Sequence, residues 1–231
     1  MTSNRLRHSR VMRALIFDFD GLLVDTEASA FRAWRQVLAG YGADLPLPVW
    51  QAVIGGQSSV AAVLSHLEHA VGTVDREAVV ARWRDTNRAF AARMPLRDGV
   101  GEFLSAARAD GLRLAVASGA TRDWVSEHLD RVGVSGHFAV VSALDGHRPK
   151  PAPDVYLAAL DALGVPASDA MAFEDSPTGV AAAVAAGLRC VAVPNEVTSG
   201  LAFPGAERVL PSFVAVTPGD IAHDRSKCHR H

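Results

Sequence analysis

The amino-acid sequence predicts an α/β fold in which helices cover both faces of a parallel β-sheet, with an all-helical unit inserted near the N-terminus. Short apolar runs alternate with amphipathic helical patterns over the second half of the chain. The runs are apolar almost throughout, which is typical of strands buried on both faces of a sheet. A long stretch after the first run has helical patterns and almost no strand signal.

The candidate strands are short runs, several of them rich in Val or Ile. They cover Ala14–Phe19, Leu112–Ala117, Ala139–Ser142, Ala170–Phe173, Cys190–Val193 and Arg208–Leu210. Helices are expected between the later strands, over Val100–Ala109, Arg122–Val132, Pro153–Leu163 and Thr178–Ala186. A glycine follows within two residues of each helix, which is typical of a left-handed C-terminal cap. This alternation predicts a parallel sheet with crossover helices.

The helical stretch after the first strand is longer than a crossover requires, because one helix is enough to connect two parallel strands. Amphipathic patterns over Ala28–Leu38, Ser58–Val71 and Arg76–Arg93 predict helices there. We therefore expect residues 12–26 and 96–216 to form the sheet domain and residues 27–95 to form a second, helical domain. Residues 1–11 and 217–231 are polar and are expected to be flexible ends.

Composition limits the class of protein. The chain has 231 residues, 49% hydrophobic and 21% charged, and a net charge of −2, so it is an ordinary globular protein without a nucleic-acid footprint. No apolar run reaches the roughly 18 residues of a membrane span, and Asp18, Asp20 and Asp25 interrupt the run after the basic N-terminus, unlike a secretory signal. Cys190 and Cys228 do not suggest a disulfide. We expect a cytoplasmic monomer or weak dimer with no nucleic-acid or membrane partner.

Polar side chains follow the ends of four predicted strands. They are Asp18 and Asp20 at the end of the first, Ser118, with Gly119 beside it, after the second, Lys150 between prolines after the third, and Glu174 and Asp175 after the fourth. The carboxyl ends of parallel strands lie at one edge of a sheet, and ligands of α/β proteins bind outside that edge. We therefore expect these residues to meet in one site.

The charges of this predicted site indicate what it binds. Asp18, Glu174 and Asp175 carry about −3, and like charges ~4 Å apart repel by roughly 4 kcal/mol per pair at an effective dielectric constant near 20. Such a cluster favours a hard cation, and oxygen ligands indicate Mg²⁺ rather than zinc. With the cation bound, Lys150, the Ser118 hydroxyl and free backbone N–H groups could receive a phosphoryl group.

The sequence resembles the haloacid dehalogenase phosphohydrolase superfamily. Its four motifs are matched in order by DFDGLLVDTE, ASGAT, KPAPD and FEDSPTGVAAAVAAG. The resemblance covers nearly the whole chain and implies a Rossmann-like core with a helical cap, as in the β-phosphoglucomutase-like subgroup. The implied activity is a Mg²⁺-dependent phosphatase that hydrolyses a small phosphorylated metabolite, a sugar phosphate or a similar compound.

The resemblance also implies roles for the acidic residues. Asp18 would be the nucleophile that forms an aspartyl-phosphate, and Asp20 would be the general acid and base. The Mg²⁺ ion would be held by Asp18, by the main-chain carbonyl of Asp20 and by Asp175. Glu174 would lie beside the metal or on it.

The remaining implied roles concern the substrate. Ser118 and Lys150 would act in catalysis by binding the phosphoryl group, together with Gly119 beside Ser118. In the helical domain, the loop with Gly55 and Gln57 is expected to face the substrate, because it could close over the sheet edge.

A phosphosugar mutase on the same scaffold is the alternative function. Mutases of this type carry a histidine before the Phe31–Trp34 stretch, and here Ala30 occupies that position. They also present cations in the loop that matches Ile54–Ser58, which has none here, although Arg84 and Arg88 could replace them in part. These differences favour a phosphatase.

Two further classes of protein fit the sequence less well. A phospho-accepting signalling domain also combines acidic residues, a hydroxyl and a lysine, but it is about half as long and its accepting aspartate follows a different strand from its acidic pair. A dehalogenase is disfavoured because the adjacent Glu174 and Asp175 favour metal-dependent phosphate chemistry.

Overall fold

The computed structural model describes residues 12–54, 59–142 and 146–223. They contain a six-stranded, fully parallel sheet with the strand order β3-β2-β1-β4-β5-β6. The strands are β1 (Ala14–Phe17), β2 (Arg113–Ala117), β3 (Val140–Ser142), β4 (Ala170–Glu174), β5 (Arg189–Ala192) and β6 (Arg208–Val209). The predicted α/β fold with a parallel sheet is thus confirmed.

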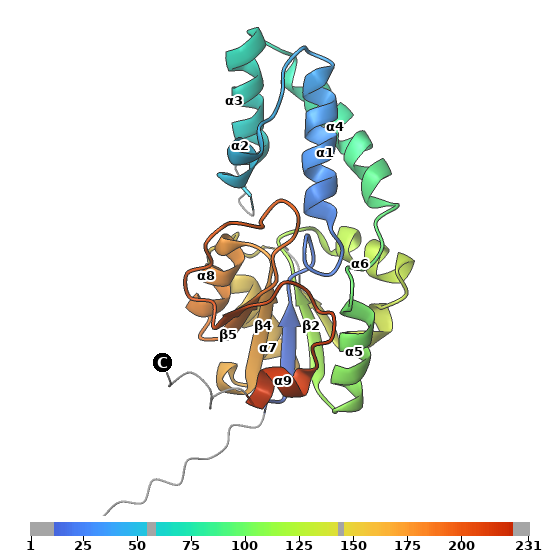
Figure 1. Ribbon diagram of the computed structural model, residues 1–231, viewed down its shortest axis with the longest axis vertical. Helices are drawn as coiled ribbons and strands as arrows, with labels where there is room; N and C mark the ends of the chain where they lie inside the picture. The colour runs from blue at the N-terminus through green and yellow to red at the C-terminus, as the bar shows by residue number, and fades with distance from the viewer. Residues whose placement is uncertain (1–11, 55–58, 143–145, 224–231) are drawn as a thin grey trace, which may run out of the picture.

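Helices cover both faces of the sheet (Figure 1). One face is covered by α5 (Val100–Ala109), α6 (Arg122–Arg131) and α9 (Pro218–His223), and the other by α7 (Asp154–Leu163) and α8 (Pro177–Ala185). Every side chain of β1 is buried, because alternate residues of this central strand point into the two cores.

Aromatic rings fill the core beneath α5. Phe17 of β1 stacks on Phe173 of β4 with ring centroids 5.1 Å apart, and Phe103 of α5 meets both rings edge-on. Burial of side chains this large stabilises the fold by roughly 1.5–3 kcal/mol each. The ends of β1 and β4, where the predicted site residues begin, are therefore held rigidly against each other.

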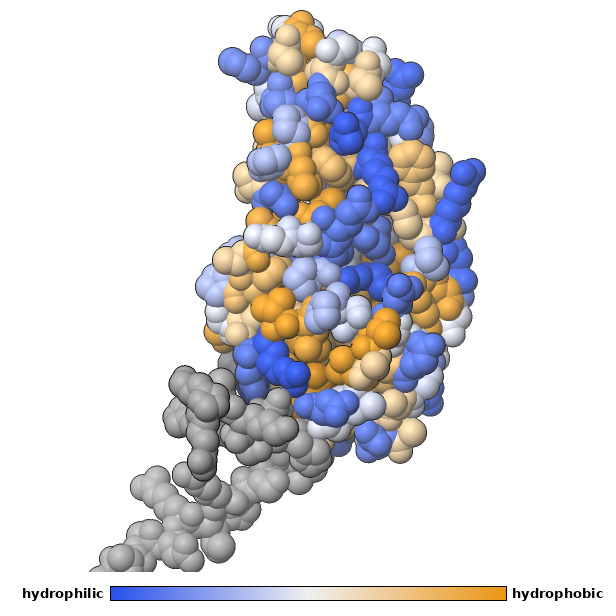
Figure 2. All heavy atoms as spheres, in the orientation of Figure 1, coloured by the Kyte–Doolittle hydropathy of each residue, from blue (hydrophilic) through white to orange (hydrophobic). Residues whose placement is uncertain are grey.

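A helical insertion, residues 26–91, lies beyond the carboxyl ends of the strands (Figure 1). It consists of α1 (Thr26–Ala39), α2 (Leu47–Gln51), α3 (Ser59–Val71) and α4 (Arg76–Ala91), which share an apolar core of their own. Trp34 of α1 stacks on Trp83 of α4 with centroids 4.7 Å apart. Figure 2 shows hydrophilic residues along this insertion, with apolar residues beside them in smaller groups.

The loop after β5 belongs to the sheet domain but packs against the helical insertion. Val197 in this loop is buried in the apolar core of the insertion. Gln51 of α2 donates a hydrogen bond from Nε2 to the Val197 carbonyl (2.9 Å), and Glu196 forms an ion pair with Arg32 of α1. A segment of the sheet domain is therefore part of the packing of the insertion.

Two helices were not expected from the sequence. The short α2 lies where no helical period was visible, and α9 lies in the segment that we expected to be flexible. That expectation was wrong for the start of residues 217–231, because α9 begins at Pro218. Its Ile221 side chain packs into the core of the sheet domain, and the residue is only 2% exposed. The end of the segment, with Cys228, lies outside the described residues. Within the described part of the chain, no helix has the length and apolar character needed to cross a membrane.

Candidate active site

Asp18 is the first residue after β1 and lies at the carboxyl edge of the sheet. Its backbone N–H donates to the Phe173 carbonyl at 3.0 Å, which extends the β1–β4 pairing by one residue, and Asp18 is only 6% exposed. Three residues on, Gly21 has a φ of +84°, and a Cβ there would lie 2.3 Å from Oδ2 of Asp175. Glycine is needed at this turn because the backbone passes directly beside Asp175.

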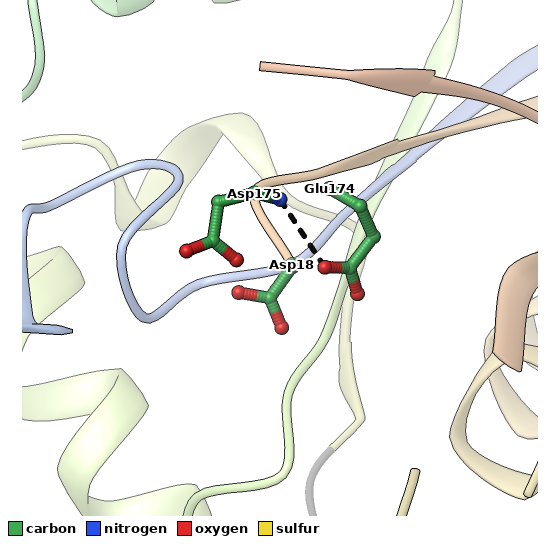
Figure 3. Close-up of side chains that lie close together, drawn as sticks. All are labelled: Asp18, Glu174 and Asp175. Atoms are coloured by element: carbon green, nitrogen blue, oxygen red, sulfur yellow. Dashed lines mark hydrogen bonds between the residues drawn. The ribbon is translucent and has the colours of Figure 1, made fainter. Parts of the chain in front are cut away.

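Three buried carboxylates meet at this edge (Figure 3). One oxygen from each of Asp18, Glu174 and Asp175 lies within 4.8 Å of the others. Burial raises the pKa of Asp18 and of Asp175 well above the usual range, and the negative charge of Glu174 adds to the effect on both. An all-oxygen donor set of this size and charge fits Mg²⁺, whose charge would offset the repulsion.

Lys150 provides the positive charge of the site. Its Nζ donates hydrogen bonds to Oδ1 of Asp18 and, at 2.6 Å, to Oε1 of Glu174. Burial alone would lower the pKa of Lys150, but Asp18 and Glu174 raise it above its ordinary value, so the amine stays charged. Tyr156 also donates to Oε1 of Glu174, at 2.5 Å, so Glu174 is held by groups of the protein.

Asp20 is held apart from the three carboxylates. Its Oδ1 accepts hydrogen bonds from Thr26 Oγ1 at 2.7 Å and from the indole Nε1 of Trp124 at 2.9 Å, and its Oδ2 accepts from Ser118 Oγ at 3.2 Å. The Asp20 carboxylate therefore does not join the metal-binding group. Metal ligation through its main-chain carbonyl stays a prediction, as do the catalytic roles of the other site residues.

The position of the Trp124 ring is fixed by contacts with His128 on the same helix. The ring of His128, one helical turn later on α6, lies with its centroid 4.1 Å from that of Trp124, and His128 Nδ1 is 2.9 Å from the Trp124 carbonyl oxygen. His128 is buried, with only 3% of its surface exposed. The indole that contacts Asp20 is thus fixed by packing as well as by its hydrogen bond.

A cavity of about 350 Å³ lies over these residues, between the sheet edge and the helical insertion. From the sheet domain it is lined by Asp18, Asp20, Gly119, Ala120, Pro149, Lys150, Asp175 and Ser176, and from the insertion by Glu27, Trp50, Ile54, Ser59 and Trp83. The acidic group thus opens onto a space large enough for a small metabolite.

The remaining predicted substrate contacts do not all lie on the cavity. Ser118 is completely buried beneath the cavity, on Asp20. Gly55 and Gln57 lie outside the described residues. Arg84 and Arg88 are exposed on α4 and are not among the described residues that line the cavity.

Asn195 is a site residue that the sequence reasoning missed. Its Nδ2 donates to Oδ2 of Asp175 at 2.6 Å and to the Gly21 carbonyl at 3.1 Å. Its Oδ1 accepts from the backbone of Val197 and Thr198. The available signal was its position just after a strand, at the same edge as the other polar clusters.

Without Mg²⁺, the free energy of unfolding is expected to rise as the pH falls from about 8 toward about 5. Burial, with the charges of Asp20 and Asp18, raises the pKa of Glu27 from 4.5 to about 8. The folded state therefore keeps a proton in this range that the unfolded chain releases, and folding becomes more favourable at lower pH. Urea unfolding in EDTA at several pH values measures the slope. Glu27→Gln should reduce it, and an unchanged slope in that variant would contradict the prediction.

Comparison with known proteins identifies the family. The family model for haloacid dehalogenase-like hydrolases matches residues 12–187. This chain belongs to that family, as the sequence motifs implied. It is 38% identical to the Bacillus subtilis protein YhcW over 88% of this chain and 93% of that protein. It is 32% identical to the Escherichia coli fructose-1-phosphate phosphatase YqaB over 78% and 95% of the two chains.

Solved structures agree with the fold. CbbY from Rhodobacter sphaeroides in complex with phosphate superimposes with a TM-score of 0.76 at 30% identity, covering 91% of this chain and 99% of that chain. A second CbbY structure contains xylulose-(1,5)bisphosphate, with a TM-score of 0.75 at 28% identity and the same coverage. A β-phosphoglucomutase from Clostridium difficile has the same fold, with a TM-score of 0.76 at 19% identity over 91% and 96% of the chains. The predicted enzyme class, a phosphoric monoester hydrolase, agrees with the family and with the phosphatase relative YqaB.

Proposed function

We propose that this protein is a Mg²⁺-dependent phosphatase that hydrolyses a small phosphorylated metabolite such as a sugar phosphate. The observation that carries the proposal is the buried group of Asp18, Glu174 and Asp175 beside Lys150, opening onto the cavity. The phosphatase name of YqaB and the phosphate bound to CbbY support it.

Asp18 is the nucleophile of the proposed reaction. One of its oxygens attacks phosphorus in line with the leaving oxygen, and the new O–P bond of an aspartyl-phosphate forms as the ester O–P bond breaks. Lys150, which donates a hydrogen bond to Asp18, stabilises negative charge on the equatorial phosphoryl oxygens. Bound Mg²⁺, held by Asp18, Asp175 and the main-chain carbonyl of Asp20 with Glu174 beside it, would neutralise further charge at the phosphoryl group.

Asp20 is the general acid and base of the proposed reaction. It donates one to the leaving alkoxide in the first step and removes one from the attacking water in the second, which releases phosphate and restores Asp18. The indole Nε1 of Trp124 can only donate a hydrogen bond, so Oδ1 of Asp20 must accept this bond and carries no proton. The exchangeable proton of Asp20 is then carried on Oδ2, where Ser118 can accept as well as donate.

Trp124→Phe is expected to slow hydrolysis of sugar phosphates about 10-fold or more, because a misoriented acid loses part of the 10²–10⁴-fold benefit of general acid catalysis. The kcat for p-nitrophenyl phosphate should fall much less, because its leaving group departs without a proton. Steady-state kinetics with both substrates measure the difference. Equal losses for both would show that Trp124 only supports the fold.

The helical insertion is the proposed cap over the site, within the expected domain of residues 27–95. It provides one wall of the cavity, and its packing against Val197 gives it a third point of attachment besides the two chain connections. Covering the site excludes bulk water and selects the leaving group. The proposed setting is the cytoplasm, with a small-molecule substrate.

The test of the proposed function is phosphate release from a panel of phosphorylated sugars, nucleotides and small acids with Mg²⁺. Isomerisation is checked in parallel with β-glucose 1-phosphate and a trace of the 1,6-bisphosphate. We expect phosphate release without isomer formation, because Ala30 replaces the histidine that mutases carry. Glucose 6-phosphate formed much faster than phosphate would overturn the phosphatase assignment.

A further inference from the structure

The loop after β5 contacts two separate parts of the molecule, the acidic group and the helical insertion. At the acidic group, Asn195 donates a hydrogen bond from Nδ2 to Oδ2 of Asp175 at 2.6 Å. Two residues later, Val197 is buried in the apolar core of the insertion, and its carbonyl accepts a hydrogen bond from Gln51 of α2. Figure 1 shows the loop reaching from β5 toward the insertion. One short segment therefore lies between Asp175 and the insertion.

The segment between these two contacts is a closed turn. Oδ1 of Asn195 accepts hydrogen bonds from the backbone N–H groups of Val197 at 2.9 Å and Thr198 at 3.0 Å, as in an Asx turn. The backbone N–H of Asn195 donates to Oγ1 of Thr198 at 2.9 Å, and all three residues are buried. The turn therefore moves as one unit, and a shift of Val197 displaces the side-chain amide of Asn195.

The start of the loop is fixed by the linker through which the chain returns from the insertion. Arg97 in this linker donates hydrogen bonds to the carbonyls of Val193 at 2.9 Å and Pro194 at 2.5 Å. It also donates to the Gly21 carbonyl at 2.8 Å, the same oxygen that Asn195 reaches at 3.1 Å. A Cβ at Gly21 would lie 2.5 Å from Nδ2 of Asn195, so the amide is closely packed.

The hydrogen bond from Asn195 orients the carboxylate of Asp175. A carboxylate held through one oxygen no longer rotates freely about its Cβ–Cγ bond, so both oxygens of Asp175 keep fixed positions beside Asp18. Groups that orient a metal ligand in this way change the affinity for the metal by roughly 10–100-fold. The affinity of the acidic group for a cation thus depends on where the turn holds the amide.

We infer that Asn195 is a positioning residue that orients Asp175 for Mg²⁺ and, through Val197, couples metal binding to the packing of the helical insertion. The inference rests on the proposed function and adds a link between its metal site and its cap. Coupling between two sites is reciprocal. Packing of the insertion against Val197 therefore strengthens Mg²⁺ binding, and bound Mg²⁺ stabilises the insertion in its place over the site.

The first measurement is the Kd of Mg²⁺, determined by isothermal titration calorimetry with the metal alone. Asn195→Ser is the informative variant, because a serine hydroxyl can accept the hydrogen bonds of the turn but is too short to reach Asp175. Its Kd for Mg²⁺ should rise about 10-fold. Val197→Ala, which keeps the Asn195 amide, should raise the Kd about 5-fold. In the double variant, Val197→Ala should add less than about 2-fold, because the link is already broken.

Val79→Ala is the matched control for Val197→Ala. Val79 is buried in the same apolar core but belongs to α4 rather than to the loop after β5. Its substitution removes the same two methyl groups and weakens the insertion without changing the turn, so the Kd of Mg²⁺ should stay within about 2-fold of wild type. A Kd raised as much as in Val197→Ala would overturn the inference, and so would additive effects of Asn195→Ser and Val197→Ala.

Hydrogen exchange measures the coupling from the side of the insertion. Mg²⁺ should slow exchange of the amides at the end of α2, those of Trp50 and Ala52, about 5-fold in the wild type and not in Asn195→Ser. Circular dichroism shows that each variant is folded. Equal slowing in both proteins would overturn the inference.

Phosphate release by the same proteins separates the inference from the proposed function. Active Asn195→Ser protein with the wild-type Kd for Mg²⁺ would overturn the inference and leave the phosphatase assignment intact. Coupling found in a wild-type protein that hydrolyses no phosphomonoester would instead support the inference and overturn the proposed function.

Discussion

Asp18→Asn protein is expected to fold normally and to turn over phosphomonoesters roughly 10⁴-fold more slowly than the wild type, or worse, because loss of a catalytic nucleophile has effects of this size or larger. An amide has nearly the volume of the carboxylate but cannot attack phosphorus. The substitution also removes one charge from a group of three buried acids, so the fold should tolerate it even though Lys150 loses an ionic partner.

The measurement is phosphate release by the purified variant, with circular dichroism and thermal unfolding to show that it is folded. Asp85→Asn is the matched control, because Asp85 is exposed on α4, far along the chain from the acidic group, and the same chemical change there should leave turnover intact. Turnover by folded Asp18→Asn within a few-fold of wild type would remove Asp18 from its assigned role.

Removal of Mg²⁺ with EDTA is expected to abolish turnover and to lower the midpoint of thermal unfolding. Asp18, Glu174 and Asp175 are buried close together, so the folded state without a cation contains repulsion that the unfolded chain does not. A ligand that binds only the folded state stabilises it, by about 2.7 kcal/mol at a concentration of 100 times its Kd. Ca²⁺ should inhibit, because it takes about 6–8 ligands and tolerates a geometry in which Asp18 is bidentate.

Thermal unfolding and phosphate release are followed together while Mg²⁺ is added back to EDTA-treated protein. Both should recover over the same concentration range, and Asp175→Asn should shift both to higher Mg²⁺. Full activity in EDTA would contradict the metal assignment, and so would equal rates with Ca²⁺ and Mg²⁺.

The elements with strong periodicity could be predicted from the sequence. Helix α5 was expected over Val100–Ala109 and is found there, because its apolar residues recur on one face and the fold does not disturb them. Helix α2 could not be predicted, since its five residues include a proline and show no full period. Helix α9 is short as well, and its stability comes from Ile221 in the core, a contact invisible in the sequence.

Some residues of the site could likewise be predicted from the sequence, and others could not. Asp18, Lys150, Glu174 and Asp175 could be predicted to meet, because one rule about strand ends places them at one edge and no detailed geometry is needed. Trp124 could not be identified as a partner of Asp20. An aromatic residue on an amphipathic helix is more often part of a core, and only the rotation of α6 against the sheet shows that its N–H faces the carboxylate.

The pairing of β1 on both sides also has a consequence for how the molecule is made. Ala14 pairs with Arg113 on one side and with Ala170 on the other, and the whole helical insertion lies between β1 and β2. On the ribosome, the segment with Asp18 is therefore synthesised long before Lys150, Asp175 and Asn195. Until β4 has emerged, β1 is an apolar strand without one of its neighbours, which is a state prone to misassembly. We conclude that the nascent chain is most vulnerable to aggregation in this interval, and that the active site forms late, when the C-terminal half closes around the first strand.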